Sequence, residues 1–141
     1  MTAAELRRLT LAGLLAVVVL IAYWTTWYVD RDLVASDHTG SYVDFENAFP
    51  LADAWLGACV LLALRAAHRR RQTLLLWLLA VGGAGVYLFA MDVLYDLEHG
   101  IYAKGAGGVI ELAINLLTLG LSGWFLRWAW LRRTEILSWP G

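Results

Sequence analysis

The chain has 141 residues, a formal net charge of −1 and a hydrophobic fraction of 60%. This apolar fraction is too high for an ordinary soluble domain. Cys59 is the only cysteine, which excludes an intrachain disulfide and a two-cysteine redox centre.

Four apolar stretches occupy most of the chain, at 9–29, 49–67, 73–95 and 109–131. A helix of about 20 residues, which is the length of these stretches, crosses the hydrocarbon core of a bilayer. None of them alternates like a barrel strand, and the first lacks a signal-peptide cleavage pattern. We therefore expect an all-α integral membrane protein: a single domain over 1–141 with four transmembrane helices in an up-down bundle.

Basic residues gather on one side of this arrangement. If the four helices alternate in direction, that side carries Arg7, Arg8, Arg65, Arg69, Arg70, Arg71, Arg127, Arg132 and Arg133. The positive-inside rule then predicts cytoplasmic N- and C-termini and an outer loop at 30–48. We expect the cytoplasmic (plasma) membrane of a bacterium as the location. The basic run at 68–71 is interpreted as a topology determinant, so no nucleic-acid partner is expected.

Carboxylates lie inside or at the ends of the apolar stretches. They are Glu46, Asp53, Asp92, Asp96 and Glu111. A charged side chain near the centre of a spanning helix costs roughly 2.5–3.5 kcal/mol on insertion scales. Such residues normally face the bundle interior and are candidates for a functional site.

Helical spacing predicts which way the third span faces. Residues that recur at intervals of three and four share one face of this helix, and they are Gly82, Gly85, Phe89, Asp92, Asp96 and His99. Glycine on a spanning helix is typical of close helix packing. This face is therefore predicted to point inward. The two aspartates also lie near the C-terminus of the helix, where its dipole disfavours them.

The fourth span carries a small and polar stripe on one face, made of Gly108, Glu111, Asn115, Thr118 and Ser122. Hydroxyl and amide side chains in such stripes often serve only as interhelical hydrogen-bonding groups, and we interpret Thr118 and Ser122 in this way. Glu111, with Asn115 one turn deeper, favours a site. We expect Asp53, Asp92, Asp96, Glu111 and Asn115 to converge in one cavity.

The outer side has far more acids than bases. Its fixed cations are Arg31 and Lys104, whereas its acids are Asp30, Asp32, Asp37, Asp44, Glu46, Asp53, Asp92, Asp96, Glu98 and Glu111. Loop acids can be solvated, but acids within the helices require protonation, a bound metal or a cationic ligand.

Two chemistries fit these residues. Asp92, Asp96, His99 and Glu111 could hold a divalent metal as cofactor. Oxygen ligands suit Ca²⁺, Mg²⁺ or Mn²⁺, and the histidine extends the choice to zinc or iron. Alternatively, Asp92 and Glu111 are candidate catalytic residues, one as acid and the other as base.

Aromatic residues near the acids suit a lipidic or cationic small molecule. The expected ligand-binding residues are Asp53, Asp96, Asn115, Glu46, His99, Trp24, Trp27, Trp55 and Tyr95. For Trp24 and Trp27 we favour anchoring at the bilayer interface over a binding role, whereas Trp55 differs because it lies beside the acidic layer.

The function expected from the sequence is that of a small polytopic membrane protein. Its outward-facing acidic and aromatic pocket would bind a small ligand, a lipid or a divalent cation. The alternatives are an intramembrane acid–base enzyme, isomerase- or cyclase-like, acting on a lipidic substrate; a transporter; and an accessory subunit without chemistry of its own. The expected partners are the lipid bilayer and a second copy of the chain.

Overall fold

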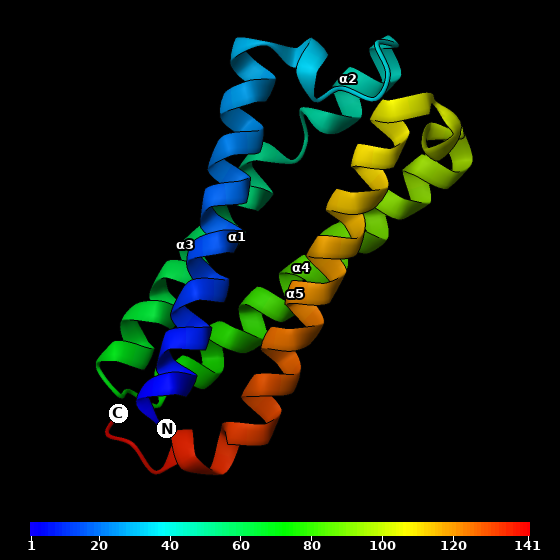
Figure 1. Ribbon diagram of the computed structural model, residues 1–141. Helices are drawn as coiled ribbons and strands as arrows, with labels where there is room; N and C mark the ends of the chain where they lie inside the picture. The colour runs from blue at the N-terminus through cyan, green and yellow to red at the C-terminus, as the bar shows by residue number, and fades with distance from the viewer.

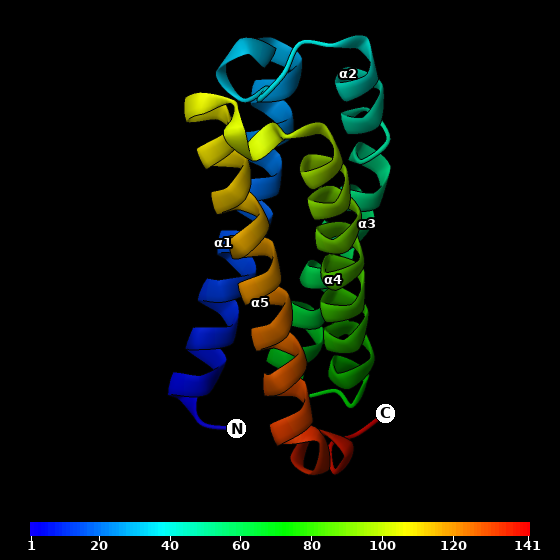
Figure 2. The ribbon, with the colours of Figure 1, turned by 90° about the vertical axis from the view of Figure 1, so that its right-hand side faces the viewer.

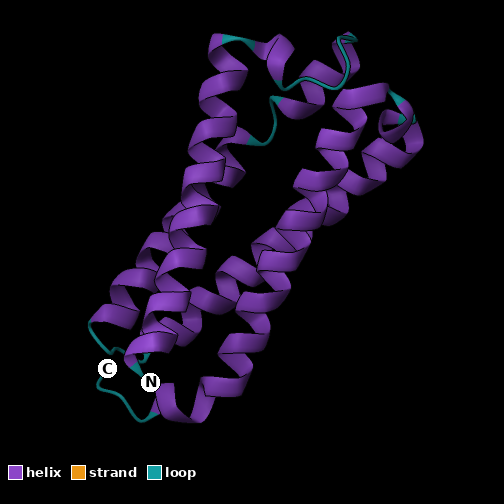
Figure 3. Cartoon of the chain, viewed as in Figure 1, coloured by secondary structure: helices purple, strands orange, loops and turns teal.

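The computed structural model describes residues 1–141 and contains helices and no strands (Figure 3). In chain order the elements are α1 (Ala3–Val29), η1 (Arg31–Leu33), α2 (Gly40–Glu46), α3 (Pro50–His68), α4 (Thr73–His99), η2 (Ile101–Ala103) and α5 (Gly105–Leu137). Four segments are long and apolar enough to cross a membrane, with α2 and α3 together forming the second. This confirms the predicted helical class and the predicted number of segments that are long and apolar enough to span a membrane.

Local capping interactions determine where the helices begin and end. At the start of α1, the Thr2 side chain accepts a hydrogen bond from the Glu5 amide and the Glu5 side chain accepts one from the Thr2 amide. This capping box lets α1 begin before the apolar stretch does. At the end of α4, Gly100 adopts a left-handed conformation with φ 62°, which glycine tolerates without strain and which stops the helix.

The expected outer loop at 30–48 is more ordered than its polar composition indicated. It contains η1 and α2, and α2 belongs with α3 to the second candidate spanning segment, with a short interruption at 47–49. Pro50 explains the interruption, because it lacks the amide that would bond to the Glu46 carbonyl and its ring would crowd that carbonyl. The break leaves Glu46 at the end of α2, just above the start of α3.

The four long helices pack in sequence order. α1 packs on α3, α3 on α4, and α4 on α5, whereas α1 and α5 have no extended contact. Both chain termini lie at one end of the molecule, and α2 caps the other (Figures 1 and 2). The main apolar core lies toward the terminal end and includes Leu9, Cys59, Leu78 and Phe125. A smaller cluster of Trp27, Tyr42 and Ile101 lies beneath the opposite cap.

Glycines bring α4 close to α5. A Cβ atom on Gly85 would overlap the Ser122 side chain, and one on Gly82 would overlap Leu126. Both glycines are buried, as are Asp96 on the same face of α4 and Asn115 on the facing side of α5. The inward direction predicted for this face is therefore confirmed at these positions.

Candidate functional site

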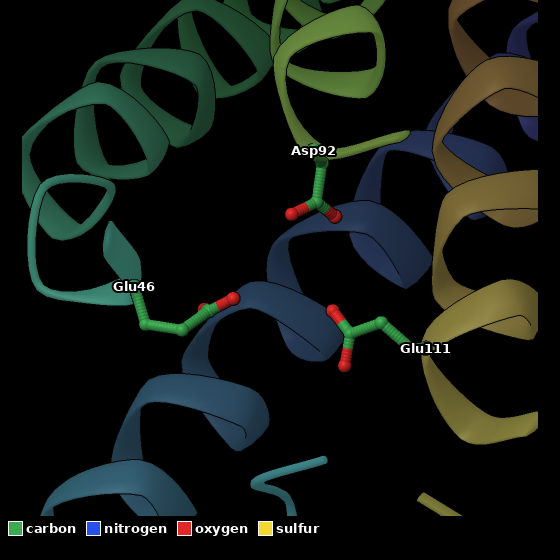
Figure 4. A group of neighbouring side chains, drawn as sticks. All are labelled: Glu46, Asp92 and Glu111. Atoms are coloured by element: carbon green, nitrogen blue, oxygen red, sulfur yellow. The ribbon is translucent and has the colours of Figure 1, made fainter. Parts of the chain in front are cut away.

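Three carboxylates from three different elements meet inside the helix bundle. Glu46 reaches in from the end of α2, Asp92 from α4 and Glu111 from α5 (Figure 4). One oxygen of each lies within 4.8 Å of the others. Glu46 and Glu111 are 4% and 2% exposed, and Asp92 is half-buried. We call this group the carboxylate cluster.

The hydrogen bonds around the cluster are incomplete. The Tyr23 hydroxyl donates to Glu46 Oε2 at 3.0 Å, and the Ser36 hydroxyl donates to Glu111 Oε2 at 2.8 Å. Glu46 Oε1 is buried and has no hydrogen-bond partner. A buried carboxylate oxygen without a partner is costly, so this atom marks where a ligand would be stabilised.

No fixed positive charge offsets the carboxylate cluster. Its members form no ion pair with lysine or arginine, because Lys104 pairs with Asp37 and the Arg31 guanidinium lies over the Trp27 ring, 4.8 Å from its centroid. Two unit charges 4.8 Å apart repel by about 3 kcal/mol at an effective dielectric constant near 20. Three ionised carboxylates at this spacing therefore require a compensating cation or protons.

A cavity of about 100 Å³ adjoins the carboxylate cluster. It lies between α1, α3, α4 and α5, and its polar or aromatic lining comprises Tyr23, Trp24, Glu46, Phe49, Asp53, Phe89, Asp92, Glu111, Asn115 and Thr118. Since a water needs roughly 10–15 Å³ of such space, the cavity has room for an ion with several waters or for a small polar head group.

The cavity contains four of the five groups that were expected to converge there. Asp53, Asp92, Glu111 and Asn115 line it, and Asp53 accepts a hydrogen bond from Trp24 Nε1 at 2.8 Å. Asp96 lies behind this lining, where its Oδ2 accepts a hydrogen bond from Asn115 Nδ2 at 2.9 Å. Its other oxygen is buried without a partner.

The metal-ligand set differs in composition from the one expected. Asp92 and Glu111 come together, but Glu46 completes the group in place of Asp96 and His99. His99 is exposed at the end of α4, where its ring stacks on Tyr95 and its Nδ1 lies 2.9 Å from the Tyr95 carbonyl oxygen. His99 is the last residue of α4, and the helix ends at Gly100 directly after it.

The remaining aromatic candidates occupy different places. Trp24 lines the cavity. Trp27 is buried beneath α2 and donates to Asn47 Oδ1 at 3.2 Å, and Tyr95 stacks on Phe45. Trp55 is exposed on α3 and does not line the cavity. Trp24 is thus the only one of the four that the structure brings to the acidic cavity.

Two hydrogen-bond donors to the carboxylate cluster, Tyr23 and Ser36, were not predicted from the sequence. Tyr23 lies one helical turn before Trp27, and its position beside an inward aromatic residue was a usable signal. Ser36 lies in the loop before α2, and no periodic pattern indicates that it reaches Glu111. A further contact joins Asn115 Nδ2 to the Tyr102 hydroxyl at 2.9 Å, which ties η2 to this layer.

The chain is thus an all-helical protein with four candidate membrane-spanning helices and a group of three converging carboxylates, two buried and one half-buried. It matches no family model, no curated protein and no solved structure.

The loop that carries Ser36 is tied to the start of α5 by Asp37 and Lys104. The hydrogen bond from Lys104 lowers the pKa of Asp37 to about 2 from its ordinary value of 3.8. A carboxyl whose pKa is lowered on folding stabilises the protein above its unfolded-state pKa, and this contribution is lost as pH falls through the folded value.

We expect Asp37→Asn to destabilise the protein at neutral pH. The difference from wild type should shrink as pH falls from 3.8 to about 2 and vanish below that. Urea unfolding of both proteins in detergent across this range measures it. Asp30→Asn is the control, because Asp30 is exposed and forms no ion pair. A pH-independent difference would show that the Asp37–Lys104 pair does not stabilise the loop.

Proposed function

We propose that this protein is a membrane protein whose carboxylate cluster binds a divalent metal ion inside the helix bundle. The observation that carries the proposal is Glu46 Oε1, which is buried, lacks a partner and belongs to a group of three converging carboxylates. No lysine or arginine neutralises that group. A divalent cation would supply the missing positive charge and a partner for the unpartnered oxygen.

The donor atoms favour a hard cation. Carboxylate oxygens prefer Ca²⁺, Mg²⁺ or Mn²⁺, and no histidine or cysteine belongs to the cluster. Since these ions take six or more ligands, three carboxylates leave positions for waters or for an oxygen of a second ligand. The adjoining cavity provides room for such ligands.

The interrupted second membrane helix supports the same location. Irregular backbone at membrane depth is tolerated where it lines a cavity or is covered by protein, and broken helices place ion and substrate sites in many membrane proteins. Here the break at 47–49 follows Glu46 directly, and Phe49 and Glu46 both line the cavity.

The proposed membrane arrangement is an up-down bundle with cytoplasmic termini in the bacterial cytoplasmic membrane. The nine arginines on the terminal side support it through the positive-inside rule. The carboxylate cluster would then lie below the outer surface, beneath α2.

Cysteine labelling tests this orientation. Ser41→Cys and Gly105→Cys should react with a membrane-impermeant maleimide added outside intact cells, because both positions are exposed at the α2 end. Arg70→Cys, in the exposed link between α3 and α4, should react only after the membrane is opened. Wild type provides the background, since Cys59 is buried. The opposite pattern would contradict the proposed orientation.

Thermal unfolding in nanodiscs tests the metal site. Ca²⁺, Mg²⁺ or Mn²⁺ should stabilise wild type by RT ln(1 + [M]/Kd), which is about 2.7 kcal/mol at 100 times Kd. Glu46→Gln should lose this stabilisation, because a neutral amide replaces the unpartnered carboxylate. Asp44→Asn is the matched control on α2, since Asp44 is exposed and outside the cluster.

If none of the three ions stabilises wild type, or if Glu46→Gln responds as Asp44→Asn does, the metal proposal is wrong. Asp92 and Glu111 would then remain as the acid and base of the alternative enzyme, acting on a lipidic substrate.

A further inference from the structure

A second hollow lies next to the acidic cavity, nearer the middle of the bundle. It has a volume of about 60 Å³ and is lined mainly by apolar side chains, including Ala16 on α1, Val60 on α3 and Leu121 on α5. It shares Val19, Leu20, Leu56 and Thr118 with the acidic cavity. The two hollows are therefore neighbours, one beside the carboxylate cluster and the other mainly apolar, and we call the pair the central channel.

The central channel exists because α1 and α5 do not pack together along their middle. They are joined near the terminal end by Glu5 and Arg132, and near the other end the loop that follows α1 contacts α5 through the bond between Ser36 and Glu111. Between these ties, α1 presents the short side chains of Ala16 and Val19. The separation of the two helices is visible in Figure 1, and the hollow lies between their facing side chains.

The length of the central channel suits an extended hydrocarbon chain rather than a compact solute. The lining on α5 runs from Glu111 to Phe125, which is about 21 Å of helix at 1.5 Å per residue. The apolar part is lined by α1, α3, α4 and α5, which belong to the segments that are long and apolar enough to span a membrane, and α1 and α5 have no extended contact beside it. A hydrocarbon chain could thus enter it from the bilayer without crossing water.

We propose that the central channel holds one hydrocarbon chain of a lipid whose uncharged hydroxyl head group lies in the acidic cavity. The inference rests on the proposed function in one respect, because the hydroxyl oxygen would occupy an open position on the metal. A hydroxyl also donates a hydrogen bond, and Glu46 Oε1 has a second lone pair that could accept it beside the metal. A phosphate head group would instead add negative charge beside three carboxylates.

Photocrosslinking with a diazirine-bearing hexadecanol tests this proposal, using the full chain in nanodiscs and peptide mapping by mass spectrometry. Crosslinks are expected on the inner faces of α1 and α5, at Ala16, Leu121 and Phe125. Val19→Phe should reduce them at least fivefold, because Val19 lines both hollows and the new ring fills space between them. Val18→Phe is the matched control, since Val18 is 61% exposed on the outer side of α1.

Unlabelled hexadecanol should compete with the crosslinking, and hexadecyl phosphate should not. Equal crosslinking in Val18→Phe and Val19→Phe, labelling confined to outward leucines such as Leu15 and Leu119, or stronger competition by the phosphate would each overturn the proposal.

Metal binding is scored separately, on wild type and on Ala16→Phe, because Ala16 lines the apolar hollow and not the acidic cavity. Ala16→Phe should lose crosslinking at Leu121 and Phe125 and retain metal-induced stabilisation, and this combination supports the chain site. Crosslinking that is blocked by Val19→Phe but accompanied by no metal binding in wild type would overturn the metal proposal and leave the chain site in place.

Discussion

Replacing Asp92 with Asn is expected to raise the stability of the metal-free protein and to abolish its stabilisation by divalent cations. The change removes one of three neighbouring carboxylate charges while nearly preserving shape. Because each pair at this spacing repels by about 3 kcal/mol at an effective dielectric constant near 20, we expect a gain of about 1–3 kcal/mol without metal. At 100 times Kd, the variant should lack the roughly 2.7 kcal/mol that wild type gains from the metal.

Chemical denaturation in detergent, with and without Mn²⁺, measures both effects of Asp92→Asn. Glu98→Gln is the control, because Glu98 is exposed on the same helix and outside the cluster. Equal metal-induced stabilisation of Asp92→Asn and wild type would remove Asp92 from the site.

Replacing Gly108 with Ala is expected to be the most damaging single-methyl change in the chain. A Cβ atom at this position would overlap the Ile101 carbonyl oxygen and lie 2.8 Å from the Tyr102 carbonyl carbon. These are backbone atoms of η2, so no side-chain rotation relieves the overlap. Forced backbone shifts of this kind typically cost about 1–3 kcal/mol.

The effect of Gly108→Ala should extend to the site, because Glu111 follows Gly108 by one helical turn. We expect weaker metal binding together with lower stability in detergent unfolding. Gly120→Ala is the matched control on α5, since a Cβ atom there meets nothing within 4 Å. Equal stability of the two variants would contradict the close approach of α5 to η2.

The helical repeat and the glycine pattern were sufficient to predict how α4 and α5 face each other. Gly85, Asp96, Glu111 and Asn115 are all buried, as their spacing in the sequence indicated. This succeeded because close packing of two long helices is determined mainly by which face carries small residues. Asp92 and Glu111 lie on the same two helix faces, so their inward direction could be predicted in the same way.

For Glu46 and His99, the helical periodicity of the sequence was not sufficient to predict where the side chain lies. Both lie at helix ends, where the direction of a side chain depends on the next turn of the chain. Pro50 interrupts the second membrane helix and places Glu46 in the cluster, whereas the turn at Gly100 leaves His99 exposed. The contact of Ser36 with Glu111 is long-range and depends on the folded path of the loop.

Electron paramagnetic resonance of Mn²⁺ tests the central claim most directly. Titration of the purified chain in nanodiscs should show one protein-bound Mn²⁺ per chain, displaced by Ca²⁺ or Mg²⁺. The triple variant Glu46→Gln, Asp92→Asn, Glu111→Gln should retain its helical circular dichroism and bind no Mn²⁺ within the bundle. A folded triple variant that binds Mn²⁺ with the stoichiometry and affinity of wild type would contradict the assignment of the metal to the carboxylate cluster.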